Sequence, residues 1–338
     1  MNVPRLTIGL PVYNGERFLS QSLDDLLAQT FEDFELIISD NASTDSTADI
    51  CADYARRDSR IRYVRQPVNI GSAPNHNAVL AMARGEYFKW ASDDDLYRPS
   101  LLASCVAELD AHPEAVLCHA WEAFIGEDST TIQPVTYRLQ TADPKASVRL
   151  RSLLYDSGGD DIYGVIRTAV LRKNSVHGSY HHADRTFVAA LALHGPFHQV
   201  PEVLYLRRDH PGRTERSAQG RRSRAAILDP RRGNRWRNPM ARLYGEYVLG
   251  YVTAIVRAPL SIAERLRCLG EVAWWAVGHL RPGSDRRLLE NTFDPAVRAR
   301  AQQSIADRGT TRFGLPLPGR SNTDALRSKD SSHHSGPS

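Results

Sequence analysis

The chain has 338 residues, of which 41% are hydrophobic and 24% charged, with a modest formal net charge of +4. This is ordinary globular composition, and the length allows one large domain with an appendage. No stretch of about 18 apolar residues occurs, so we expect no membrane-spanning helix. Met1 to Pro4 leads directly into a strand-like run, so we also expect no secretory signal.

Strand and helix patterns alternate along the first 90 residues. Apolar runs typical of strands occur at 6–10, 34–39, 61–64 and 87–90, and helical patterns at 18–29, 46–57 and 75–82. This alternation predicts an α/β fold, with a parallel sheet that has helices on both faces. No G-x-G-x-x-G or G-x-x-x-x-G-K-[ST] motif follows the first strand, which excludes the usual dinucleotide fingerprint and the P-loop.

Acidic residues follow two of the predicted strands. Asp40 ends the second strand, and Asp93, Asp94 and Asp95 follow the fourth. The carboxyl ends of parallel strands share one edge of a sheet, so both groups would face one crevice. Adjacent carboxylates repel each other unless a cation lies among them, and Mg²⁺ or Mn²⁺ prefers such oxygen ligands together with substrate phosphates. The alternative is that Asp40 is a turn residue and the triple Asp a solvated turn that caps the next helix.

Further elements follow in chain order. The patterns predict a helix at 99–109, a strand at 116–121, and a loop-rich acceptor region at 126–161 with a short helix around 147–155. Asp184 precedes a helical pattern that runs to His194, so one reading of it is a helix cap. A late strand at 203–206 leads into a charged turn that ends at His210.

The C-terminal part combines basic, aromatic and low-complexity segments. Twelve Arg and no Lys lie between Arg207 and Arg242, which predicts contact with an acidic group or, alternatively, a solvated basic loop. Helical patterns at 244–255 and 262–279 predict a hairpin packed on the main domain. Their Trp, Tyr and nearby Arg leave a lipid-surface patch as the other reading. Residues after about Gly309 are predicted to be disordered. The four Cys form no C-x-x-C pair and are expected to be small core residues.

Several motifs together resemble the family 2 glycosyltransferases in order and spacing. They are Pro11-Val12-Tyr13-Asn14, Gln29-Thr30-Phe31 to Phe34-Glu35, Ser39 to Asp45, Asn69-Ile70-Gly71, Arg84 to Tyr87, and Asp93-Asp94-Asp95. The resemblance covers about residues 5–125 strongly and extends to about 215 more loosely. It implies the GT-A fold, a UDP-, GDP- or dTDP-sugar donor, and inversion at the anomeric carbon.

The resemblance also implies roles for individual residues. Pro11 and Tyr13 would line the nucleobase pocket, Asp40 and Asn41 would lie at the base and ribose, and Asp93 near the ribose. Asp94 or Asp95 would hold Mn²⁺ or Mg²⁺ on the diphosphate, and we favour Asp94.

Other positions carry the resemblance less fully. The family often has Asp in place of Asn41 and Arg in place of His76, so the base preference and a diphosphate contact by His76 stay open. Similar enzymes end the domain with an Arg/His segment, so His210 or Arg207 would touch the pyrophosphate; the alternative is a surface turn.

Asp184 would be the general base. Ala183-Asp184 aligns with a Glu-Asp pair of the family, with the Glu missing. A sugar hydroxyl is a poor nucleophile, so a carboxylate must take its proton as it attacks. His181 and His182 could serve as metal ligands, but adjacent His at a helix start rarely both bind a metal.

We therefore expect an inverting, metal-dependent, hexosyltransferase-type enzyme for cell-surface glycan synthesis, in the cytoplasm and peripheral at the inner face of the membrane. The acceptor would be a glycan or a lipid-linked group, and no nucleic acid partner is expected because no reading element accompanies the Arg-rich segment. The alternatives are a non-catalytic sugar-nucleotide-binding module and a nucleotidyltransferase. The expected parts are a catalytic domain at 1–215, an Arg-rich linker at 216–240, a helical region at 241–308 and a disordered tail at 309–338.

Overall fold

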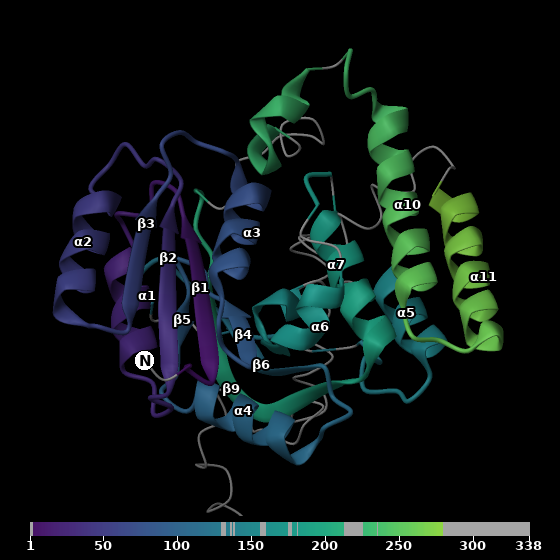
Figure 1. The fold of residues 1–338 in the computed structure, drawn as a ribbon, viewed down its shortest axis with the longest axis horizontal. Helices are drawn as coiled ribbons and strands as arrows, with labels where there is room; N and C mark the ends of the chain where they lie inside the picture. Colours follow the sequence, from purple (N-terminus) through teal and green to yellow (C-terminus); the bar gives the residue numbers. More distant parts are fainter. Residues whose placement is uncertain are drawn as a thin grey trace, which may run out of the picture. The chain divides into compact units, whose positions relative to one another are not determined.

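The computed structural model describes residues 3–129, 133–135, 137, 139–155, 160–174, 178–180, 182–212, 226–234 and 236–279. All of them belong to one compact unit, Met1–Ser284 (Figure 1). His181, much of the Arg-rich linker and the tail predicted to be disordered lie outside the described residues.

The first half of the sheet has the predicted parallel arrangement. Four strands are hydrogen-bonded in the order β3-β2-β1-β4, and every neighbouring pair among them is parallel. The strands are β1 (Leu6–Val12), β2 (Phe34–Asp40), β3 (Ile61–Arg65) and β4 (Tyr87–Trp90). The helices that connect them are α1 (Leu19–Leu27), α2 (Thr47–Arg57) and α3 (Ser72–Met82). The predicted alternation is thus confirmed, with α3 beginning three residues before the predicted helix.

The sheet continues in the order β8-β6-β9-β5, with β7 beside β6. β8 is antiparallel to β4 and β6, β6 and β9 are parallel, and β5 is antiparallel to β9. The strands are β5 (Leu96–Tyr97), β6 (Leu117–Ile125), β7 (Gln133–Pro134), β8 (Val165–Arg167) and β9 (Phe197–Arg208). The sequence did not predict β5 or β8, which are too short to show a period, and β9 begins six residues before the predicted late strand.

Helices complete this half of the fold. They are α4 (Leu101–Ala111), α5 (Ala146–Tyr155), α6 (Thr168–Lys173), α7 (Ala183–His194), α10 (Met240–Arg257) and α11 (Ile262–His279), with short 3₁₀ turns η1 (Asp160–Tyr163) and η2 (Pro230–Gly233). None of the described helices is long and apolar enough to cross a membrane.

The strands bury both of their faces, because successive side chains point to opposite sides. Leu36 and Ile38 belong to a core cluster formed with residues of α1, α2 and α4. Ile37, Phe88 and Trp90 belong to a second cluster formed with α3, α7, α10 and α11. Figure 1 shows α2 and α3 on opposite sides of the β1–β3 strands. The four cysteines are buried and free, as their spacing predicted.

The C-terminal helices form the predicted hairpin, which packs on α5 and α7. Tyr251 and Trp275 are buried at this contact. The Ser147 amide donates to the Glu264 carboxylate at 2.7 Å, which joins the start of α5 to α11. Hydrogen bonds from Ser147 lower the pKa of Glu264 to about 2, so this link stays charged at neutral pH.

Candidate active site

The carboxyl ends of β1, β2 and β4 meet at one edge of the sheet. Val12 pairs with Asp40 across β1 and β2, and Asp93 lies just beyond the end of β4. The loop after β1 comes so close that a Cβ on Gly15 would lie 2.2 Å from Oδ2 of Asp93. The structure thus brings the two acidic segments to the same edge, and a larger residue at position 15 would force the Asp93 and Val12 side chains to shift.

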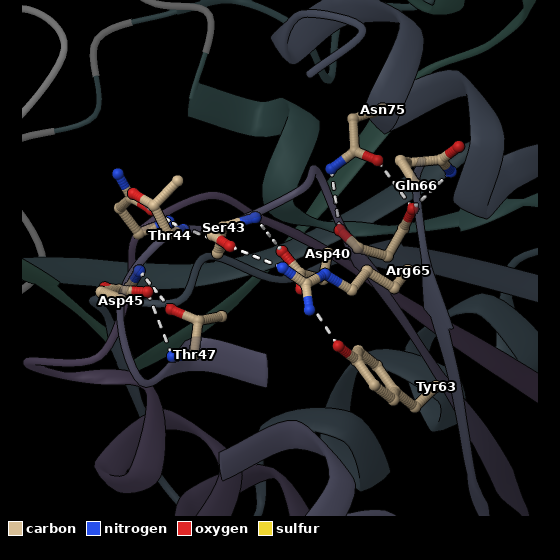
Figure 2. Close-up of polar contacts among 12 residues, drawn as sticks. Asp40, Ser43, Thr44, Asp45, Thr47, Tyr63, Arg65, Gln66 and Asn75 are labelled. Carbon is tan, nitrogen blue, oxygen red and sulfur yellow. Dashed lines mark hydrogen bonds and ion pairs between the residues drawn. The ribbon is translucent and has the colours of Figure 1, made fainter. Parts of the chain in front are cut away.

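Asp40 organises the loop that follows β2 (Figure 2). It has no exposed surface, and its Oδ1 accepts a hydrogen bond from the Ser43 amide at 2.8 Å. Its Oδ2 accepts from the Tyr63 hydroxyl at 3.0 Å and lies 3.4 Å from Arg65 Nε. Burial and the Asp40 carboxylate raise the pKa of Tyr63, which stays a donor. Asp40 is therefore fully engaged in shaping this loop.

Asn41 links the same loop to the loop before α3. Its Oδ1 accepts from the Ile70 amide at 2.8 Å, and its Nδ2 donates to Asn69 Oδ1 at 3.0 Å. Gly71 follows with a φ of 95°, and a Cβ there would lie 2.6 Å from the carbonyl oxygen of Leu228. Part of the Arg-rich stretch, around Leu228, therefore packs against the loop before α3 at this edge.

Three other predicted site residues lie around the edge. Pro11 is part of β1, opposite Ser39, because the strand continues to Val12. Tyr13 follows the strand and is 47% exposed, which leaves its ring open to a flat ligand. His76 is half-buried on α3, where its Nδ1 donates to the carbonyl oxygen of Ser72 at 2.8 Å.

The acidic run after β4 contains two partly exposed carboxylates. Loss of solvent around Asp93 and the neighbouring carboxylate of Asp94 both raise the pKa of Asp93 above its usual value. The Asp94 carboxylate accepts from the Ser92 hydroxyl, and its Oδ2 lies 2.9 Å from His210 Nε2. The His210 ring packs edge-on against Phe18 at 5.0 Å. A carboxylate oxygen beside an imidazole nitrogen is a donor pair that fits a divalent ion such as Mn²⁺.

Asp95 differs from its two neighbours because both of its carboxylate oxygens have protein partners. It is buried, its Oδ1 accepts from the Arg208 amide at 2.9 Å, and its Oδ2 accepts from the Tyr205 hydroxyl. Its own carbonyl oxygen accepts from the Ser22 hydroxyl at 2.6 Å. Asp95 thus fastens the acidic run to β9, and Asp94 is the neighbour whose carboxylate reaches toward His210.

Arg208 is a functional candidate that the sequence analysis missed. Its buried guanidinium donates to the carbonyl oxygen of Asp94 at 2.8 Å, to that of Glu127 at 2.9 Å, and to Gln21 Oε1 at 2.9 Å. Burial lowers its pKa, while the nearby acidic side chains oppose that change. The adjacent Arg207 instead lies near Glu122, with an N–O distance of 3.6 Å. Neighbouring strand residues point to opposite faces, which directs the two guanidinium groups to different sides of the sheet.

Lys89 is a second missed residue. It is buried in β4, and its Nζ donates to the carbonyl oxygen of Tyr163. The Nζ lies 5.4 Å and 5.3 Å from the ring centres of Tyr97 and Tyr205, a cation–π arrangement. Burial lowers the pKa of Lys89 to about 8. Because Lys89 lies between the apolar residues Phe88 and Trp90, the sequence pattern predicts a buried strand but no role for the lysine.

Asp184 lies in the first turn of α7 and is exposed. The residue at the cap position is His182, with a φ of 61°, so Asp184 itself is not the helix cap. Phe187, one turn further along α7, packs edge-on against Trp90 at 5.5 Å, which places this part of α7 beside the end of β4. A pocket of about 330 Å³ lies between α7 and α10 and is lined by Tyr180, Ala183 and Thr186, among others.

The Arg208 contacts lead to a prediction for stability. We expect Arg208→Met to lower the free energy of unfolding by about 3 kcal/mol or more, because buried carbonyl acceptors lose their donors and the carboxylates lose their cation. Urea denaturation followed by circular dichroism measures this. Arg98 directly follows β5, and its side chain is exposed. As a control, Arg98→Met should change the free energy of unfolding by no more than about 0.5 kcal/mol. Equal stability of the two variants would contradict the account.

The chain is similar in sequence to proteins of a known family. The model of the family described as "Glycosyl transferase family 2" matches residues 7–178. The Bacillus subtilis (strain 168) protein named "Uncharacterized glycosyltransferase EpsJ" is 33% identical over 108 residues, which is 32% of this chain and 31% of that protein. Glycosyltransferase GlyG of Streptococcus pneumoniae is 29% identical over 109 residues, 31% of this chain and 36% of GlyG. The matched segments thus span about a third of these curated relatives.

Solved structures show the same architecture. S. aureus TarS 1–349 superposes with a TM-score of 0.62 at 17% identity, covering 90% of this chain and 80% of TarS. The mannosyltransferase PcManGT from Pyrobaculum calidifontis gives a TM-score of 0.51 at 18% identity, covering 93% of this chain and 78% of that one. At these identities the likeness concerns the fold, and it confirms the predicted GT-A fold. Because the family model matches just over half of its residues, the chain belongs to glycosyl transferase family 2.

Proposed function

We propose that the chain transfers a sugar from a nucleotide-diphosphate sugar to an acceptor hydroxyl, with inversion at the anomeric carbon. The observation that carries the proposal is the meeting of Gly15, Asp93, Asp94 and His210 at one edge of the sheet. The TarS structure is described as a complex with UDP-GlcNAc, and that of PcManGT as a complex with GDP-Man and Mn²⁺. These descriptions support a nucleotide-sugar donor for this chain as well.

The donor would be held by residues with separate tasks. The exposed Tyr13 ring and the adjacent Pro11 offer a surface for the base, and Asp93 would meet the ribose. Asp40 and Asn41, both buried and hydrogen-bonded to neighbouring loops, would act at the base and ribose mainly by fixing the shape of the pocket. The half-buried His76 would face the diphosphate.

Asp94 and His210 would hold Mn²⁺ or Mg²⁺ on the diphosphate, with Asp95 as a positioning residue behind them. Such an ion, when bound, neutralises the charge that develops on the leaving diphosphate. The chain's own contribution is to hold the Asp94 carboxylate through the Ser92 hydroxyl and the Asp94 backbone carbonyl through the Arg208 guanidinium. Carboxylate ligands held in this way need no rearrangement when the donor arrives.

Asp184 would act as the general base for the acceptor. The acceptor oxygen forms a bond to the anomeric carbon, its proton moves to the Asp184 carboxylate, and the diphosphate leaves with the electron pair of the broken C–O bond. The pocket between α7 and α10 is lined by Ala183, the residue before Asp184, and its polar lining includes Tyr180 and Glu246. This pocket supports entry of the acceptor from that side.

A first prediction concerns the metal. We expect Asp94→Ala to abolish metal-dependent donor hydrolysis and the Mn²⁺-dependent part of nucleotide binding, measured by calorimetry with UDP, GDP and dTDP. Asp49→Ala, at an exposed carboxylate on α2, should leave both unchanged. Mn²⁺-dependent binding that survives in Asp94→Ala, with the fold intact by circular dichroism, would reject the assignment.

A second prediction separates binding from transfer. Asp184→Asn keeps the size of the side chain but cannot accept the proton, so we expect intact donor binding and loss of transfer by about 100-fold or more. Equal transfer rates for the wild type and Asp184→Asn would show that Asp184 is not the general base. Nucleotide binding in the wild type without turnover of any donor would instead favour the non-catalytic binding module.

We further propose that the enzyme works on a cell-surface glycan or a lipid-linked acceptor at the inner face of a membrane. Leu266, Trp274 and Val277 on α11 are 63%, 75% and 58% exposed, and Leu249 and Val256 on α10 are 59% and 57% exposed. An exposed apolar stripe beside arginines such as Arg267, whose side chain is 64% exposed, suits an anionic lipid surface.

The membrane proposal predicts binding to vesicles of phosphatidylcholine with phosphatidylglycerol. The double variant Leu266→Ser, Trp274→Ser should lose most co-sedimentation, because its apolar stripe is interrupted. Trp236→Ser removes a tryptophan that is 83% exposed outside these helices and should sediment like the wild type. If all three proteins sediment equally, or none does, the stripe does not bind lipid.

A further inference from the structure

We propose that Glu108, His112 and His198 bind a divalent transition-metal ion, best suited to Zn²⁺, at a site separate from the acidic run. Glu108 lies in the last turn of α4, His112 directly follows that helix, and His198 is the second residue of β9. Among the described residues, one ligand atom from each of the three lies within 4.8 Å of the others. No step of the proposed transfer reaction uses these side chains.

The distances suit a metal. Glu108 Oε1 lies 3.1 Å from His198 Nδ1 and 3.5 Å from His112 Nε2. Zinc bonds of about 2.0–2.1 Å in tetrahedral geometry place ligand atoms about 3.3 Å apart. The rings of His112 and His198 are 4.2 Å apart between centres and tilted by 39°, so both can turn a nitrogen toward the Glu108 carboxylate. A carboxylate and two imidazoles are a familiar donor set for Zn²⁺, with water as the fourth ligand.

Glu114 supplies the outer partner that such a site needs. A histidine that binds a metal through one nitrogen usually donates its other N–H to a carboxylate or carbonyl. Glu114 Oε1 lies 3.4 Å from His112 Nδ1 and 3.9 Å from His198 Nε2, the nitrogens that face away from Glu108. One carboxylate would thus orient both rings.

The site is remote from the acidic run. His198 and Arg208 lie ten positions apart along β9, roughly 30 Å for an extended strand. The cluster also joins elements that are distant in sequence, the end of α4 and the start of β9. A bound ion would therefore act as a clamp between them and raise stability without entering the donor site.

The competing explanation needs no metal. Direct pairing of His112 and His198 with the carboxylates of Glu108 and Glu114, without an ion, would give the same distances. The two explanations differ in a direct way, because only the first predicts a stoichiometric, spectroscopically distinct metal complex.

The experiment uses the full chain without a histidine tag, in an Asp94→Ala, His210→Ala background that removes the donor-site ligands. Titration with Co²⁺ should give one equivalent of the strong visible absorption of four-coordinate cobalt, and Zn²⁺ should abolish it and raise Tm. His112→Gln, His198→Gln should remove this absorption. Loss of even an outer partner weakens metal sites about 10- to 100-fold, so zinc affinity should fall by more than about 100-fold.

Two further variants serve as controls. Glu108→Gln removes the carboxylate ligand alone and should give the same loss while its metal-free Tm stays near that of the parent. His181→Gln, His182→Gln removes two other adjacent histidines and should bind cobalt like the parent. An absence of four-coordinate cobalt in the parent, or equal cobalt binding after the His112 and His198 substitutions, would overturn the proposal. Either result would leave the proposed donor binding untested and unchanged, because that binding is measured separately in the wild type.

Discussion

The structure depends on holding three adjacent carboxylates at one edge of a sheet. Asp95 anchors this run: its two carboxylate oxygens accept hydrogen bonds from the Tyr205 hydroxyl and the Arg208 amide, so they are not directed at a ligand. The buried Arg208 guanidinium then fixes the backbone of Asp94 and supplies positive charge beneath the cluster. Like charges brought this close would otherwise favour protonation or an open loop.

This fastening connects the two halves of the sheet. The acidic run leaves β4, in the parallel half, and is bonded to β9, in the mixed half. On the other side, the loop after β1 reaches Asp93 through Gly15, and the loop after β2 is shaped by the buried Asp40. A ligand at this edge would therefore contact loops whose positions are each set by the others. That arrangement suits a donor with a base, a ribose and a diphosphate that must all be held at once.

Much of this was predictable from the sequence, and the limits have physical causes. The alternation of strands and helices, the parallel half of the sheet and the shared edge of Asp40 and Asp94 follow from local periodicity. Local periodicity does not predict that Arg208, and not Arg207, contacts Asp94, because a shift of one residue in strand register would exchange the faces of the two side chains. The strands β5 and β8 are too short to show a period. The partners of His198 lie 86 and 90 positions away in sequence, at His112 and Glu108, so only the fold brings them together. The roles of Asp184, Tyr13 and His76 rest on family resemblance, since no contact on its own distinguishes them.

The most direct test of the central claim is an anomalous diffraction map from crystals soaked with Mn²⁺ and a nucleoside diphosphate. We predict a manganese peak within about 2.3 Å of an Asp94 carboxylate oxygen, beside His210 and in contact with the diphosphate. A diphosphate bound at this edge with no peak near Asp94, or one bound on another face of the sheet, would contradict the account.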